Sequence, residues 1–231
     1  MDVGGEKRTA FNKHAIMIIR HCIWASFLAI AAASAAFAFG GERVKKEDPK
    51  PVVTHTAIIK TTVGDIEIEL YGVDAPKTVA NFVGLAQKDF YNGILFHRVV
   101  PNFVIQAGDP KTKDSTLRSQ WGRGGESIYG GDFADEVNPA SPSRQQGYVA
   151  GALAMANRGP NTNTSQFFIV TNSAGGGGLA QYNTYTIFGM VTKGMDVVRK
   201  IEVTPANANQ QPLTPIAIQS VTVTPVGGGN R

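Results

Sequence analysis

Cysteine is almost absent from this chain of 231 residues: Cys22 is the only one. It lies in an N-terminal apolar run that we expect to be removed, and it lacks the leucine and small residues that precede a lipid-attachment cysteine. The mature chain would then have no disulfide, thiol nucleophile or thiolate metal ligand. Histidine is scarce too. Only His55 and His97 follow that run, without paired ligand spacing, so neither a metal nor another cofactor is expected.

Other signatures of catalysis are also missing. No G-x-S-x-G elbow occurs, although a dispersed serine triad stays open as an alternative. The stretch Gly124-Gly-Glu-Ser lacks the lysine of a phosphate-binding loop, and no strand–G-x-G-x-x-G–helix unit is found. These absences argue against a nucleotide-binding enzyme.

The N-terminal 38 residues read as a secretory signal peptide. Four basic residues precede an apolar run, Cys22 to Phe39, which ends in Ala36-Phe37-Ala38, and this predicts cleavage after Ala38. An uncleaved membrane anchor is the alternative, because the run is near the lower length for a span. Removal takes away four basic and two acidic residues and leaves 18 against 16, so the charge does not indicate a nucleic-acid partner.

The rest of the chain divides into three parts. Residues 39–56 are charged and proline-bearing, which predicts a polar leader that serves as a tether. Residues 57–224 form the predicted globular domain, and 225–231 a flexible tail. A hydrophobic content of 42% suffices for a core in such a domain.

Alternating apolar residues predict many short strands. A hairpin is expected from Ala57 to Leu70 around Val63-Gly64. Asp74 is predicted to cap a helix whose apolar face repeats at i, i+3, i+4 and i+7, namely Val79, Phe82, Val83 and Ala86. Later segments with strand patterns are 148–156, 166–171, 185–191 and 216–223, with a short helix at 195–201. This pattern predicts a closed antiparallel barrel or a sandwich.

One stretch, Phe96-His-Arg-Val-Val-Pro-Asn-Phe-Val-Ile-Gln-Ala-Gly-Asp-Pro110, places a cation and an amide among apolar residues. It predicts strands at 95–100 and 103–107, joined at a Pro101-Asn102 corner. Alternation would put Phe96, Arg98 and Val100 on one face and His97 on the other. Phe103 and Gln106 would come round beside Arg98, which indicates an apolar pocket with a few polar groups.

With three further blocks, this stretch closely resembles the cyclophilin family of peptidyl-prolyl cis-trans isomerases. The blocks are Ala154-Met-Ala-Asn-Arg-Gly-Pro-Asn-Thr-Asn-Thr-Ser-Gln-Phe-Phe-Ile169, Gly124-Gly-Glu-Ser-Ile-Tyr-Gly130 and Tyr185-Thr-Ile-Phe-Gly189. The resemblance covers residues 57–223. It implies a mainly β fold, a closed eight-stranded antiparallel barrel capped by two α-helices, and the signal indicates a bacterial exported form.

The resemblance also implies the roles of the site residues. Such an enzyme must favour the twisted state of an X–Pro bond, and Arg98 is the candidate donor to that state. Phe103 and Gln106 join it as catalytic residues. The substrate-binding residues implied are Val104, Gly122, Ala156, Asn157, Gln166, Phe168, Leu179 and Tyr185.

Each assignment has a structural alternative. Arg98 would by default lie on a solvated face, and Phe103, Val104 and Phe168 in the core. Gln106 and Gln166 would satisfy buried backbone groups. Asn157 lies in a strong turn sequence. His97 is interpreted as structural.

Three segments depart from the family pattern. Gly175-Gly-Gly-Gly178 stands where many cyclophilins have a tryptophan just before the residue matched by Leu179, which predicts a mobile segment and weakened binding of cyclosporin-type ligands. Tyr185 replaces a common histidine. Lys111 to Trp121 is longer than the family minimum, and Trp121 is either a surface anchor or part of a small cluster.

The sequence therefore predicts an exported, cofactor-free prolyl isomerase that acts on proline-containing polypeptides in a periplasm. An N-terminally anchored or secreted protein is the alternative for location. A monomer without nucleic-acid partner, and without membrane contact after signal cleavage, is expected. The alternative function is a module that binds proline-containing segments without useful turnover.

Overall fold

The computed structural model describes residues 48–182 and 184–227. The predicted signal peptide, the first part of the leader and the last four residues lie outside the described residues. Within the described residues, no helix is both long and apolar enough to cross a membrane.

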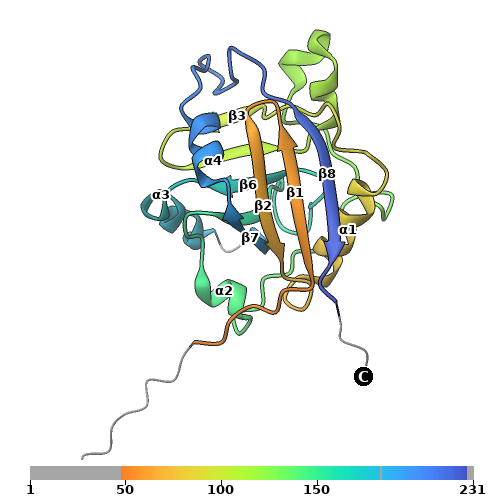
Figure 1. Ribbon diagram of the computed structural model, residues 1–231, viewed down its shortest axis with the longest axis vertical. Coiled ribbons are helices and arrows are strands. Elements are labelled where there is room, and N and C mark those ends of the chain that lie inside the picture. Colours follow the sequence, from red (N-terminus) through yellow and green to blue (C-terminus); the bar gives the residue numbers. More distant parts are fainter. Residues whose placement is uncertain (1–47, 183, 228–231) are drawn as a thin grey trace, which may run out of the picture. The chain divides into compact units, whose positions relative to one another are not determined.

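Eight antiparallel strands form one curled sheet in the order β3-β4-β6-β5-β7-β2-β1-β8 (Figure 1). The expectation of a closed barrel is wrong, because β3 and β8 do not pair as strands. The residues just before them meet instead: Leu95 and Ala217 form an isolated bridge, and backbone hydrogen bonds of 2.8–2.9 Å join residues 93–96 to 216–218. The strands are β1 (His55–Thr61), β2 (Gly64–Leu70), β3 (Arg98–Val100), β4 (Val104–Ala107), β5 (Ala152–Met155), β6 (Phe167–Val170), β7 (Ile187–Lys193) and β8 (Ile218–Pro225).

The β1–β2 hairpin follows the alternation in the sequence. Ile59, Ile66 and Ile68 are buried, while the residues between them face outward or are half-buried. The register pairs His55 with Leu70, and on its other side β1 pairs His55 with Pro225 of β8. The chain therefore enters and leaves the sheet at neighbouring positions.

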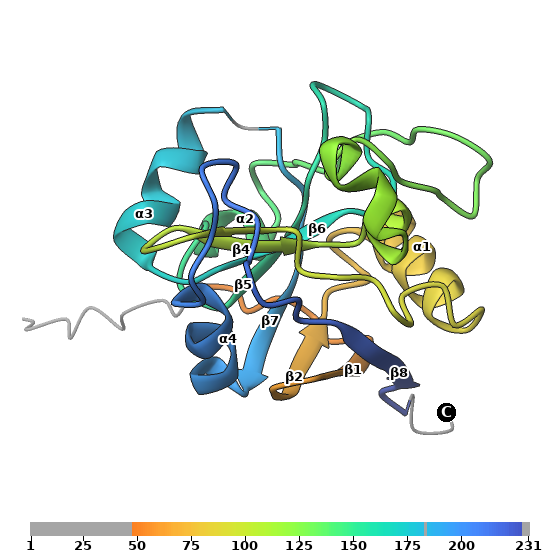
Figure 2. The ribbon, with the colours of Figure 1, turned by 90° about the horizontal axis from the view of Figure 1, so that it is seen from above.

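In the part of the chain that the structure describes, four α-helices accompany the sheet, against the two expected: α1 (Pro76–Ala86), α2 (Pro142–Gln146), α3 (Ser173–Gly177) and α4 (Met195–Glu202). Figures 1 and 2 show α1 and α4, the two longest, well apart at the two ends of the curled sheet, and the buried apolar residues of both helices belong to the main core. The prediction that Asp74 caps α1 is wrong, because its Oδ2 accepts the Ser143 N–H at 2.7 Å. Glu136 instead accepts the N–H groups of Lys77 and Thr78 at 3.0 and 2.9 Å, so the cap comes from a distant part of the chain.

Apolar side chains gather on both faces of the sheet. The main core contains Phe82, Phe167 and Phe188 together with the buried residues of β1, β2 and α1. A second, smaller cluster lies on β4, β5 and β6 and includes Val104, Ala154 and Phe168. Strands buried on both faces are apolar at every position, and the second cluster forms the floor of the site described below.

Two departures from the family pattern contain helical turns. The segment 111–121 forms two 3-10 turns, η1 (Pro110–Lys113) and η2 (Ser115–Gln120), and Trp121 stacks under Arg118 within it. The glycine run continues α3 into the turn η3 (Gly178–Gln181). A Cβ on Gly175 or Gly176 would lie 2.0 Å or 1.9 Å from a backbone carbonyl oxygen, so close packing requires glycine at these two positions.

Candidate active site

Arg98 lies on the β3–β4 hairpin, directly opposite Gln106 in the register. Its Nη1 donates to Gln106 Oε1 at 3.3 Å, and its Nε donates to Gln210 Oε1 at 2.7 Å. The corner at Pro101-Asn102 brings the two strands together, and the Asn102 N–H donates to the buried carboxylate of Glu202 on α4. The hairpin is thus fixed both at its corner and beside Arg98.

One prediction about this hairpin is wrong. Phe96 does not share a face with Arg98, because regular strand structure begins only at Arg98. Phe96 is buried in the main core with Val99, whereas Val100 packs against the second cluster. The alternation therefore holds from Arg98 to Val100 and does not extend back to Phe96.

A cavity of about 460 Å³ opens beside Arg98. Phe168 forms its floor, and the Tyr185 ring meets that of Phe168 edge-on at 5.5 Å. Nine residues predicted from the sequence line this cavity: Arg98, Phe103, Val104, Gln106, Ala156, Asn157, Phe168, Leu179 and Tyr185. Tyr182 also lines it and was missed, although an aromatic residue between the predicted residues Leu179 and Tyr185 was the available signal.

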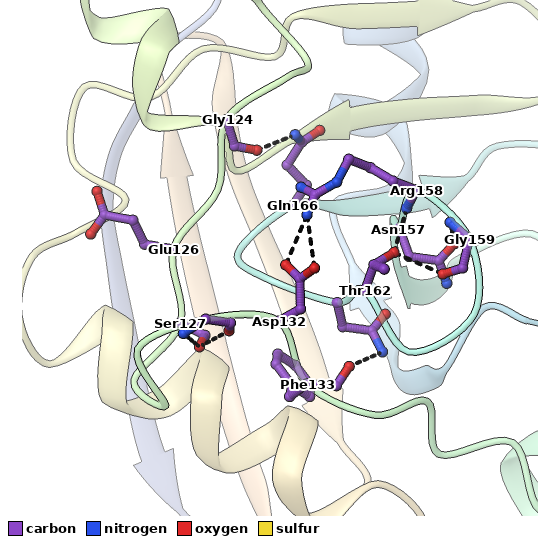
Figure 3. A network of polar contacts seen from close by, with 12 residues as sticks. Gly124, Glu126, Ser127, Asp132, Phe133, Asn157, Arg158, Gly159, Thr162 and Gln166 are labelled. Carbon is purple, nitrogen blue, oxygen red and sulfur yellow. Dashed lines mark hydrogen bonds and ion pairs between the residues drawn. The ribbon is translucent and has the colours of Figure 1, made fainter.

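Gln166 and Gly122 do not line the cavity but adjoin it. Gln106 Nε2 donates to Gln166 Oε1 at 2.9 Å. Gln166 Nε2 in turn donates to the carbonyl oxygens of Gly122 and Gly124, at 3.1 and 2.6 Å, and Figure 3 shows its amide reaching toward Gly124. This chain of amides connects Arg98 to the backbone of the 122–124 segment.

Asn157 directs its side chain inward. Its Nδ2 donates to Thr184 O at 2.8 Å and to Asp135 Oδ1 at 3.3 Å. Neither its backbone N–H nor its carbonyl is hydrogen-bonded to another described residue. Asn157 therefore presents a free backbone N–H and a free carbonyl at the cavity.

Burial lowers the pKa of two basic groups at the site, Arg98 and His97. It lowers the pKa of Arg98 below its usual value, although a guanidinium remains charged at neutral pH. His97 is only 3% exposed, and neither of its ring nitrogens has a hydrogen-bond partner among the described residues. Burial lowers the pKa of His97 from 6.5 to about 4, so this ring is neutral at pH 7.

A second, polar pocket of about 340 Å³ lies beyond Gly125. Arg158 and Asp132 line it and form an ion pair with an N–O distance of 2.8 Å. Figure 3 shows the two oxygens of Asp132 facing the guanidinium of Arg158. Both side chains are about half exposed, so this pair contributes little to the stability of the fold.

Comparison with known proteins identifies the class to which this fold and cavity belong. The family model described as cyclophilin type peptidyl-prolyl cis-trans isomerase matches residues 56–223. The chain therefore belongs to the cyclophilin-type peptidyl-prolyl cis-trans isomerases, and the enzyme class expected from the sequence is confirmed.

Individual relatives agree with the family model. A peptidyl-prolyl cis-trans isomerase-like 1 of Aspergillus fumigatus is 41% identical over 70% of this chain and 90% of its own length. Peptidyl-prolyl cis-trans isomerase 10 of Caenorhabditis elegans is 41% identical over 71% and 92%.

Solved structures support the same assignment. The crystal structure of a cyclophilin-type isomerase of Cryptosporidium parvum superimposes with a TM-score of 0.63 and 34% identity, over 75% of this chain and 98% of its own. A structure of that protein in the presence of the dipeptide Ala-Pro gives a TM-score of 0.62 and 35% identity, over 73% and 98% of the two chains.

Proposed function

We propose that the cavity beside Arg98 holds the proline ring of an X–Pro segment and that Arg98 accelerates rotation about the preceding peptide bond. The observation that carries this proposal is a half-buried guanidinium at the rim of an apolar cavity, fixed by two amides. Phe103, Phe168 and Tyr185 supply the apolar surface for the ring.

The chemistry requires only that the twisted amide be bound more tightly than the planar one. The rotation barrier of about 18–20 kcal/mol arises from resonance. In the twisted state the proline nitrogen gains lone-pair character, so the hydrogen bond from a fixed donor to the reacting amide becomes stronger. Partial burial of Arg98 reduces screening by water, which strengthens that interaction.

The remaining residues would hold the peptide on either side of the proline. The free backbone N–H and carbonyl of Asn157 are suited to pair with an extended segment. Ala156 and Leu179 add apolar contact, and the Gln106–Gln166 pair carries amide groups along the same wall. Recognition would then depend on proline and backbone more than on neighbouring side chains. The neighbour studied with Ala-Pro supports a proline-containing substrate.

We further propose that the clients are exported proteins and that the chain acts as a monomer in the periplasm. The export proposal depends on the N-terminal pattern alone, since the relatives named above are eukaryotic. Cell fractionation with N-terminal sequencing tests it: a mature chain that begins after Ala38 supports export, and a chain that keeps residues 1–38 contradicts signal cleavage.

The catalytic proposal is tested by isomerisation of a short X–Pro peptide. Arg98→Ala should reduce kcat/KM by about 100-fold or more, as expected for loss of a fixed charged donor. Arg98→Lys keeps the charge but loses the planar donors, and it should recover only a small part of the rate. Equal rates for wild type and folded Arg98→Ala would contradict the role of Arg98. No acceleration by folded wild type would favour the binding module.

A further inference from the structure

Arg98 has two amide tethers, and only Gln106 was expected from the sequence. The second, Gln210, lies 112 positions along the chain, and its Oε1 accepts the Arg98 Nε–H at 2.7 Å. This distance is shorter than the 3.3 Å to Gln106. Resting on the function proposed above, we infer that Gln210 is a positioning residue that fixes the guanidinium of Arg98 for isomerisation.

Two contacts at different nitrogens define the plane of the guanidinium. Gln210 binds Nε and Gln106 binds Nη1, and because the five N–H donors of arginine form a rigid fork, fixing two of them directs the others. The donors that Gln106 and Gln210 do not use remain available at the cavity. Without Gln210, the guanidinium would be held at one point only and could rotate.

The backbone of Gln210 indicates that its side chain is needed. Its φ is +63°, a left-handed conformation that glycine and asparagine adopt more readily than glutamine. Its carbonyl accepts the Val99 N–H at 2.8 Å, and its own N–H donates to Asn207 O at 2.9 Å. The turn is therefore paired with β3 next to Arg98, and a glutamine occupies a position where the backbone alone would favour a smaller residue.

The neighbouring Gln211 connects this turn to the 111–121 segment. Gln211 is 8% exposed, its Nε2 donates to Arg118 O at 3.0 Å, and its Oε1 accepts the Arg118 Nε–H at 3.3 Å. Figure 1 shows the segment between α4 and β8 (blue) at the same end as the 3-10 turns (green). The 111–121 segment thus supports the turn that carries Gln210.

The decisive variant is Gln210→Gly in the full chain, because it removes the amide and suits the positive φ. We expect kcat and kcat/KM for an X–Pro peptide to fall together by about tenfold with KM unchanged, the signature of a contact that acts in the transition state. Tenfold is at the lower end for a hydrogen bond to a charged group, since Gln106 remains. Thermal unfolding should not shift downward.

Three other variants distinguish position from stability. Gln210→Glu keeps the length and an acceptor oxygen and should stay within about twofold of wild type. Gln210→Asn keeps the amide and tolerates the φ but is one methylene too short, so it should lose as much as Gln210→Gly. Gln219→Ala removes an exposed glutamine from β8 and should change nothing.

The Arg98 Nε–H resonance in a ¹⁵N NMR spectrum reports on the hydrogen bond to Gln210 independently of catalysis. Its exchange with water should be slow in wild type and faster in Gln210→Gly. If Nε–H exchange differs in this way between the two proteins but wild type shows no isomerisation, the proposed function is wrong while the contact between Gln210 and Arg98 is supported. Unchanged kcat in folded Gln210→Gly, a loss confined to KM, or an unaltered Nε–H signal would each overturn the positioning role.

Discussion

The neutral state of His97 makes the stability of this fold depend on pH in a defined window. Burial lowers its pKa from 6.5 to about 4 in the folded protein. Between these two values the unfolded chain binds more protons than the folded one, so the free energy of unfolding falls as the pH is lowered. Above pH 6.5 the ring is neutral in both the folded and the unfolded state, so it no longer reduces the free energy of unfolding.

The size of this effect follows from the two pKa values. Between pH 8 and pH 5, protonation of the unfolded ring reduces the free energy of unfolding by about 2 kcal/mol. His97→Gln cannot titrate and should lack this component. The acidic residues titrate in both proteins, so the difference between wild type and variant isolates the contribution of His97.

Urea unfolding at pH 8, 7, 6 and 5 measures the difference directly. The advantage of wild type over His97→Gln should shrink by about 2 kcal/mol across this range. Parallel stability curves for wild type and His97→Gln would refute this pH dependence. A rate of X–Pro isomerisation that falls more than tenfold in the folded variant at pH 7 would contradict the structural interpretation of His97.

Three other predictions concern packing, capping and ligand binding. Phe168→Leu, which removes the ring that meets Tyr185, should lower kcat/KM at least fivefold by weakening proline binding, seen as a raised KM in peptide kinetics. Glu136→Ala leaves the first turn of α1 without its acceptors and should cost about 1–3 kcal/mol in urea unfolding with unchanged kcat; full stability in this variant would contradict the cap. Gly178→Trp should strengthen cyclosporin binding in calorimetry, because no atom lies within 4 Å of its Cβ position; equal affinity would mean that the missing tryptophan is not the cause of weak binding.

Local reasoning was sufficient to predict the hairpin wall of the pocket, because Arg98, Phe103, Val104 and Gln106 lie within a few positions of one another. The other lining residues were predicted from the family resemblance. The Pro101-Asn102 corner determines that β4 returns along β3, and the period of two then places Gln106 opposite Arg98. The same local reasoning failed for Phe96, since alternation applies only where the strand is regular.

The contacts that fix these residues could not be predicted in this way. Glu136 caps α1 from 58 positions away, and Gln210 reaches Arg98 across 112. Neither residue lies in a motif, and glutamine or glutamate in a loop is ordinary. Such long-range polar pairs depend on tertiary arrangement, which propensity and periodicity do not encode.

The glycine run shows a different limit. Four consecutive glycines indicate a flexible segment by composition. Two of them are needed because backbone carbonyls approach closely, while Gly177 and Gly178 face open space. The same residue type thus serves two purposes in one run, and only the tertiary contacts separate them.

The pairing of His55 with Pro225 has a practical consequence for engineering. Strand neighbours are about 5 Å apart, so a linker of a few residues could join the ends of the domain. A circular permutant opened in an exposed turn should therefore keep the β3–β4 hairpin intact. Fusion partners attached at either end would emerge from the same corner of the sheet, at β1 and β8, whereas Arg98 belongs to the strand at the opposite edge of the strand order.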